Sequence, residues 1–167
     1  MILLLSMQSC AQDPTKNVVD KNSNQNSYKR IHENSKFGFI NNQGDTIIPI
    51  GKYKFLNPID NRGMILATNQ KDKQGFIDID DNIIIPFNYD DLGVFSHHLT
   101  FAEKNGSFGY LNRQGKTIFD FQFTEANYFY NPGIAIVKKK SGWGLVDTLG
   151  NFKVDCIYDE IDYSREN

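Results

Sequence analysis

The sequence predicts an all-β protein built from four copies of one short repeat. The central residues of the copies are Gly38, Gly75, Gly109 and Gly144, so successive copies are 37, 34 and 35 residues apart. Self-similarity at such a period is typical of repeat architectures. The chain also contains 13 Gly, 13 Phe and 8 Tyr, which favour tight turns and strands, and we found no apolar spacing at a helical period.

Each copy contains an anchor strand followed by a tight hairpin. Six residues after the anchor glycine stands a turn residue, which is Gly in three copies and Asp81 in the second. A further strand is predicted before each anchor, and the pair Asn105-Gly106 that follows one of them is typical of a two-residue type I′ turn. These preceding strands are predicted at residues 28–33, 64–69, 99–104 and 134–139.

An outer strand follows each hairpin. The positions ten and twelve residues after the anchor are apolar in all four copies, and the position between them is Pro49, Pro86, Asp120 or Asp155. Proline cannot donate a ladder hydrogen bond, so we expect this strand either to lie at a sheet edge or to end at that residue, with that position facing outward. Each copy is thus predicted to be a three-stranded antiparallel meander.

The folded domain is predicted to span residues 28–162, with units at about 28–62, 63–97, 98–132 and 133–162. One aromatic residue follows each outer strand, and we expect it to fill the gap between consecutive units. These residues are Tyr53, Tyr89, Phe123 and Tyr158. The units are predicted to stack as a twisted linear, solenoid-like array. Propeller-like closure is the alternative, although propeller blades normally have four strands.

The repeat resembles the WG repeat, a short β-rich repeat found in many bacterial proteins. The resemblance covers residues 28–162 and rests on the pairs Trp143-Gly144, Phe37-Gly38 and Phe108-Gly109, the downstream turn Gly, and the segment Tyr158-Asp159-Glu160-Ile161. Gln74 replaces the aromatic residue in the second copy. The resemblance implies an all-β repeat domain with no catalytic residues in the motif, and it implies no ligand.

The N-terminus resembles the end of a bacterial lipoprotein signal peptide. Residues 1–9 begin with a short apolar run and lead into Cys10, which is therefore expected to carry lipid. Residues 10–27 are rich in Asn, Gln, Ser and Lys, as expected of a flexible tether, and residues 163–167 form a tail. We expect a protein held at a bacterial cell envelope, in contact with the membrane only through the lipid on Cys10. Cys156 then has no disulfide partner and is expected to be buried.

Nothing in the sequence predicts catalysis, a metal site or a cofactor. The richest acidic group does not fit a calcium loop, which needs Gly at the sixth position and Glu at the twelfth. This group consists of Asp78, Asp80, Asp81, Asp90 and Asp91. His97 and His98 are adjacent, so on an extended segment they point to opposite sides. The serines lack the setting of a nucleophile, and the 18 basic residues are balanced by 20 acidic ones, which argues against a nucleic-acid partner.

The expected function is a non-catalytic scaffold that binds another protein. Repeat arrays present extended surfaces, and the segments 51–62, 88–97 and 122–132 recur on one side of the stack. The candidate binding surface is Tyr128, Phe129 and Tyr130 in the third segment, and the alternative is that these residues cap the core. Trp143 is expected to be a buried packing residue. The alternative function is glycan or peptidoglycan binding, with aromatic rings stacked on sugars and loop Asn and Asp residues holding hydroxyl groups.

Overall fold

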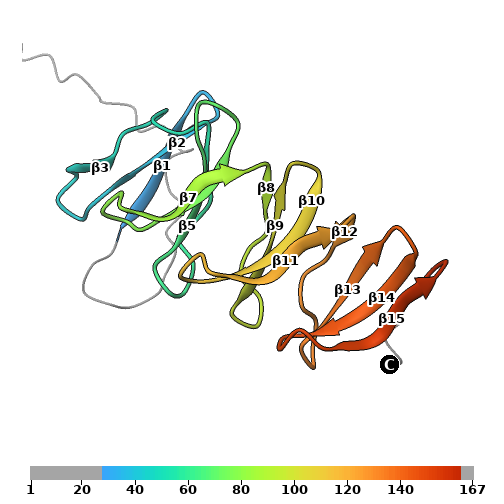
Figure 1. Cartoon of the computed structure of the whole chain (residues 1–167). Helices are drawn as coiled ribbons and strands as arrows, with labels where there is room; N and C mark the ends of the chain where they lie inside the picture. The colour runs from blue at the N-terminus through green and yellow to red at the C-terminus, as the bar shows by residue number, and fades with distance from the viewer. Residues whose placement is uncertain (1–27, 163–167) are drawn as a thin grey trace, which may run out of the picture.

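The computed structural model describes residues 28–162, and these residues form only strands, turns and loops. The strands make four antiparallel sheets that follow one another in chain order (Figure 1). The described part of the chain has no helix long and apolar enough to cross a bilayer. The predicted all-β fold and the predicted array of four units are confirmed.

Each sheet is built from consecutive strands, and from here on a unit is one sheet together with the loops between its strands. The first contains β1 (Lys29–Glu33), β2 (Lys36–Ile40) and β3 (Thr46–Ile48). The second contains β4 (Phe55–Leu56), β5 (Ile65–Thr68), β6 (Gln74–Ile77) and β7 (Ile83–Tyr89). The third contains β8 (Asp91–Leu92), β9 (Leu99–Lys104), β10 (Ser107–Asn112) and β11 (Thr117–Phe123). The fourth contains β12 (Glu125–Ala126), β13 (Ile134–Lys139), β14 (Gly142–Asp147) and β15 (Phe152–Tyr158).

Three of the four sheets contain one strand more than predicted. The additional strands β4, β8 and β12 have two residues each and come from segments predicted to be connections. Just before them, the backbone amides of Lys54, Asp90 and Thr124 donate to carbonyl groups of the next sheet at 2.8, 2.9 and 2.8 Å. The pairing satisfies the backbone polar groups of a chain that runs beside that sheet. Pairs such as Glu125-Ala126 carry no strand pattern of their own, so the sequence did not reveal them.

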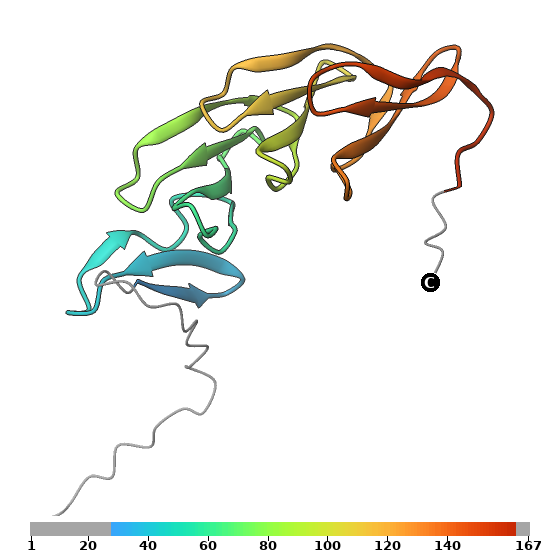
Figure 2. The same cartoon turned by 90° about the horizontal axis from the view of Figure 1, so that it is seen from below.

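The four sheets form an open curved array. Figure 2 shows the first and last sheets at the two ends of an arc. Only Asp90 separates β7 from β8, and only Thr124 separates β11 from β12, so one bent segment contributes to two neighbouring sheets. This sharing couples adjacent units. The predicted open array is confirmed, and residues 28–162 do not close into a propeller.

The apolar core lies between the sheets. One face of each of the first three sheets carries an inward aromatic residue, Phe39, Phe76 or Tyr110, and these are 2%, 3% and 0% exposed. Each clusters with apolar side chains from the following sheet; Tyr110, for example, lies in one cluster with Val137 and Val146. A unit therefore buries its apolar side chains only against a neighbour, as in other repeat proteins.

The anchor glycines are required where the outer strand crosses closely over them. In the third unit Phe108 pairs with Phe123 and Tyr110 pairs with Phe119, so three residues of β11 lie opposite Gly109 alone. A Cβ at Gly109 would lie 2.6 Å from the Phe119 carbonyl oxygen. The other three anchor glycines are equally crowded. A Cβ added at Gly38, Gly75 or Gly144 would lie 2.6 or 2.7 Å from the carbonyl oxygen of the residue ten positions later in the chain. No larger residue fits beneath this bulge.

Aromatic residues stack across the boundaries between units, as predicted. The Tyr53 ring lies 5.5 Å from the Phe87 ring at an interplanar angle of 20°, and Tyr89 lies 6.2 Å from Phe121 at 16°. In each pair the first ring belongs to a residue at the end of the outer strand of one unit, as Tyr89 does, or just after it, as Tyr53 does. The second lies twelve residues after the anchor glycine of the next unit.

Each hairpin turn is held by an Asn or Asp three residues after the anchor glycine. The Asn112 side chain accepts hydrogen bonds from the amides of Gln114 and Lys116, both at 3.0 Å. The Asp147 carboxylate accepts from the amides of Leu149 and Asn151, both at 2.9 Å. Asn41 and Asp78 occupy the equivalent positions and also accept amide hydrogen bonds. Such local bonds explain why these residue types recur in turns.

Replacing a glycine beneath a bulge should destabilise the fold. Gly109→Ala is expected to lower the free energy of unfolding by about 1–3 kcal/mol, because the new methyl group overlaps a backbone carbonyl that cannot move independently. Gly106→Asn is the matched control, since a Cβ at Gly106 meets nothing within 4 Å and Asn tolerates its positive φ. Urea unfolding followed by circular dichroism measures both effects. Equal effects of the two substitutions would contradict the crowding argument.

Acid should weaken the last hairpin through Asp147. Hydrogen bonds from the Asn151 side chain and from Lys153 hold the pKa of Asp147 well below the ordinary 3.8. A carboxylate with a lowered pKa stabilises the fold above pH 3.8, and this stabilisation disappears as the pH falls toward the lowered value. Asp147→Asn retains the turn, as Asn41 and Asn112 show, and should reduce the loss of Tm in acid. Parallel curves of Tm against pH for both proteins would exclude this role.

Candidate binding surface

The linking segments occupy equivalent positions in successive units. The amides of Asn57, Gly93 and Asn127 donate to carbonyl groups of the following strand at 2.9, 3.1 and 3.1 Å. These bonds place the segments in the same register on their sheets. We call residues 57–63, 93–98 and 127–133 the loop edge of the array.

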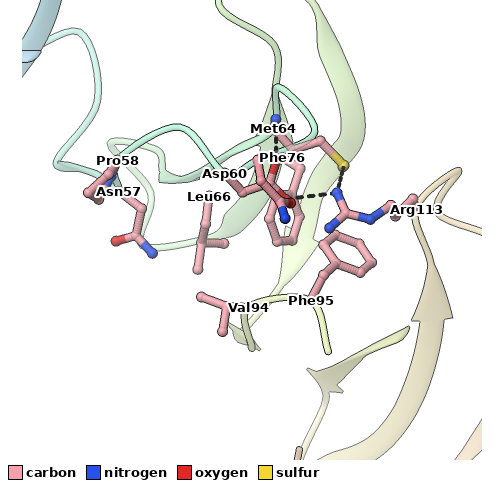
Figure 3. A pocket seen from close by; sticks show the side chains of 10 residues that line it. Asn57, Pro58, Asp60, Met64, Leu66, Phe76, Val94, Phe95 and Arg113 are labelled. Atoms are coloured by element: carbon pink, nitrogen blue, oxygen red, sulfur yellow. Dashed lines mark hydrogen bonds and ion pairs between the residues drawn. The ribbon is translucent and has the colours of Figure 1, made fainter. Parts of the chain in front are cut away.

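A small pocket opens on the loop edge between the second and third units (Figure 3). Its volume is about 90 Å³. One part of the lining is polar and consists of Asn57, Asp60, Asn61 and Arg113. The other part is apolar and consists of Pro58, Met64, Leu66, Phe76, Val94 and Phe95. This volume of about 90 Å³ is well below the roughly 300–1,000 Å³ of most small-molecule pockets, so the pocket has room only for one small group.

Arg113 closes one side of this pocket by reaching from the third unit to the second. Its Nη1 donates to Asp60 Oδ2 at 2.8 Å and contacts Met64 Sδ at 3.2 Å. The guanidinium carbon lies 4.4 Å from the centroid of the Phe95 ring, a cation–π geometry visible in Figure 3. Arg113 therefore joins the two units while keeping its charge at the pocket wall.

Asp60 is held in its charged form by hydrogen bonds. Its Oδ1 accepts from the amides of Arg62 and Met64 at 2.8 and 2.9 Å. Burial alone pushes the pKa of Asp60 upward, but the bonds from Met64, Arg113 and Arg62 outweigh it and lower the pKa below 3.8. Asp60 thus positions both Arg113 and the loop that carries the polar lining.

An exposed apolar surface continues from the pocket toward the fourth unit. Val94 at the pocket rim is 51% exposed, and Tyr128 is 39% exposed. The Tyr128 ring lies against Gly93, the neighbour of Val94, and its centroid is 5.1 Å from that of Phe101. Pro58, Val94 and Tyr128 each follow one of the three equivalent amide donors. The outward position of each linking segment therefore carries a different apolar residue.

The predicted binding group of Tyr128, Phe129 and Tyr130 is divided by the structure. Tyr128 and Tyr130 are 39% and 37% exposed, whereas Phe129 is 3% exposed and is not part of a surface. The Phe129 ring packs on Tyr110 at 4.9 Å, as Phe95 packs on Phe76 at 4.9 Å in the preceding boundary. Alternation along the segment turns Phe129 inward. The equivalent Phe95 was the signal in the sequence that could have revealed this.

Trp143 is half-buried, so the prediction that it is buried was wrong. The Lys138 Nζ lies 4.7 Å from the centroid of the indole ring. Phe37 and Phe108 at the equivalent position are also half-buried, because the core is built from the next residue on that face. Gly38, Gly75, Gly109 and Gly144 are all buried beneath the bulges, as expected of structural anchors.

Two residues of the acidic group, Asp81 and Asp90, make structural contacts. Asp81 accepts a hydrogen bond from the Tyr53 hydroxyl at 2.7 Å and pairs with Lys52, which joins the first two units. Asp90 pairs with Lys73 and accepts the Asn105 amide at 3.0 Å. Over residues 28–162 no three His, Cys, Asp or Glu side chains are grouped so that they could hold a metal ion.

Ser96 and His97 lie together in a way that the sequence did not predict. Ser96 Oγ is 3.1 Å from His97 Nδ1, and His97 Nε2 is 3.0 Å from Asn131 Oδ1. The Ser96 hydroxyl donates to the Phe129 carbonyl at 2.6 Å, so its proton is used to join the loops of the third and fourth units. Both histidines lie in a loop, as predicted. Cys156 is buried at 6% exposure, whereas Cys10 lies outside the described residues.

Comparisons with known proteins identify the repeat. The family model described as "WG containing repeat" matches residues 37–73, 75–107, 108–142 and 143–167. A search of curated proteins gave no match. The chain is similar to a solved structure titled "Crystal structure of the eukaryotic initiation factor", with 14% identity and a TM-score of 0.48. The match covers 75% of this chain and 38% of the other chain's length.

The four matched segments cover most of the chain, and each of the four units has its anchor glycine beneath the outer strand. The protein belongs to the family of WG-containing-repeat proteins.

Proposed function

We propose that the protein is a non-catalytic scaffold that binds another protein through its loop edge. The observation that supports this proposal most is the pocket beside Val94 and its continuation to Tyr128. Exposed apolar and aromatic side chains next to a pocket are the usual anchors of protein interfaces. The volume of about 90 Å³ suits one apolar side chain of a partner.

The charged groups at this surface favour an apolar anchor over a charged one. Arg113 and Asp60 neutralise each other as an ion pair, and their side chains are 15% and 31% exposed, although the buried Arg113 Nε has no hydrogen-bond partner among residues 28–162. They would therefore form the polar side of an interface whose centre is Leu66, Val94 and Phe95. The absence of catalysis is part of the proposal.

A glycan is the second candidate ligand. The pocket places the amide groups of Asn57 and Asn61 next to the Asp60 carboxylate and the apolar surface of Pro58. Amide and carboxylate groups can hold sugar hydroxyls. The small volume admits only a substituent of a sugar ring, which makes this candidate the weaker one.

We further propose that the scaffold is held at a bacterial cell envelope by lipid on Cys10. The support is the sequence pattern of residues 1–10 and the polar segment that follows it. A tether of that composition would let the array reach partners beyond the headgroup layer.

Substitutions at the loop edge should abolish partner binding. Full-length protein is used to capture partners from envelope extract, and the affinity of each captured protein is then measured. Val94→Arg and Tyr128→Ala should weaken binding by about tenfold or more, because they remove apolar anchors. Ile83→Ala is the control, since Ile83 is 61% exposed in β7 and lies outside the loop edge. Equal affinity in all variants excludes this surface. Retention on insoluble glycans that these substitutions abolish would favour the glycan candidate.

Lipid attachment has its own test. Expressed in a bacterium behind a complete signal peptide, the protein should incorporate a labelled fatty acid, and Cys10→Ser should not. Cys156→Ser removes the other cysteine of the chain and should keep the label. Label that persists in Cys10→Ser would disprove the anchor.

A further inference from the structure

We propose that the protein associates with itself head to tail, with the fourth unit of one copy packed on the first unit of a second copy. The contact would repeat the interface that joins consecutive units within the chain. This inference concerns surfaces at the two ends of the described array and is independent of the loop edge.

Two contacts recur at the boundaries between units. At the first two boundaries the aromatic residue at or just after the end of the outer strand stacks on the residue twelve positions after the next anchor glycine, as Tyr89 does on Phe121 at 6.2 Å. At the last two boundaries the turn glycine of the later unit rests on the residue ten positions after the earlier anchor. A Cβ at Gly115 would lie 3.4 Å from Ile85, and one at Gly150 would lie 3.6 Å from Phe119.

The fourth unit has the side chains that an earlier unit uses to contact the next one. Among residues 28–162 no further unit covers them. Tyr158 is 51% exposed, although the equivalent Tyr53, Tyr89 and Phe123 are 8%, 8% and 1% exposed. Leu145 is half-buried, whereas Phe39, Phe76 and Tyr110 in its position are 2%, 3% and 0% exposed. Strand pairing places Trp143 beside Tyr158, and Leu145 between Ile136 and Val154. These side chains form one apolar surface, which we call the tail face.

The first unit has the side chains that a later unit uses to contact the one before it. Ile50 is the residue twelve positions after Gly38, and it is 36% exposed. A Cβ at the turn residue Gly44 meets nothing within 4 Å, unlike its counterparts Gly115 and Gly150. Ile31 pairs with Gly38, and both Ile31 and Ile40 are half-buried. These residues form the head face, which lies at the other end of the arc in Figure 2.

The repeat register determines how the two faces would meet. Tyr158 of one copy would stack on Ile50 of the next, and Val154 would lie against Gly44. A second copy of the chain is the partner that fits the tail face best. By analogy with the internal boundaries, that face requires a sheet with a small turn residue and with an apolar residue at the Ile50 position. The head face of this chain supplies both. Such a contact joins two different surfaces, so it adds copies in a row.

Sedimentation velocity of the full 167-residue chain tests this proposal. The average mass of the wild-type protein should rise with concentration. Tyr158→Lys blocks the tail face and Ile50→Lys blocks the head face, and each should weaken association by about tenfold or more, since each places a charge in an apolar contact. An equimolar mixture of the two variants should form a one-to-one dimer and nothing larger, because each variant keeps one functional face.

Ile83→Lys is the control, because Ile83 is 61% exposed in the second unit and lies on neither face. It should associate like the wild-type protein. Thermal unfolding of each variant verifies that the fold is retained. A wild-type protein that stays monomeric would overturn the proposal. Association that survives in both blocked variants, or a mixture that forms no dimer, would also overturn it.

Discussion

The close contact between each anchor glycine and the carbonyl ten residues later determines how a unit is shaped. It allows the outer strand to bulge over the anchor strand and then resume pairing, as β11 does around Gly109. Because the bulge inserts two additional residues, alternation is preserved and Phe119 and Phe123 remain in the same core cluster. The strand is bent at this point, and its end is directed toward the next sheet. The glycine therefore connects the folding of one unit to the placement of the following one.

Stability in this architecture is a property of neighbouring pairs of units. The core clusters combine side chains from adjacent sheets, and the stacked rings Tyr53–Phe87 and Tyr89–Phe121 cross the same boundaries. Ion pairs such as Lys52–Asp81 and Asp60–Arg113 also join different units. Residues at equivalent positions consequently differ in burial according to whether a neighbour is present. Tyr89 and Tyr158 are the clearest example.

The array separates structural positions from variable ones. Phe95 and Phe129 point inward and pack on the aromatic residue of the preceding unit. The residues just before them, Val94 and Tyr128, point outward and differ in size and polarity. A repeat of this kind can change its surface at the loop edge without disturbing the core beneath. The pocket beside Arg113 is the most developed feature of that surface.

The sequence by itself determined the β class, the four units, the anchor glycines and the open array, because these follow from local patterns that recur along the chain. It did not predict the short strands β4, β8 and β12, since two residues paired through their backbones leave no side-chain pattern. It misplaced Trp143 and left open whether Phe129 lies on the surface or in the core, because the burial of both depends on the face that a neighbouring sheet covers. The pocket could not be predicted either, because Asp60 and Arg113 are 53 residues apart and meet only when two units pack. The local sequence pattern of the repeat determines the strands and turns within a unit, whereas the contacts between units depend on how the units pack.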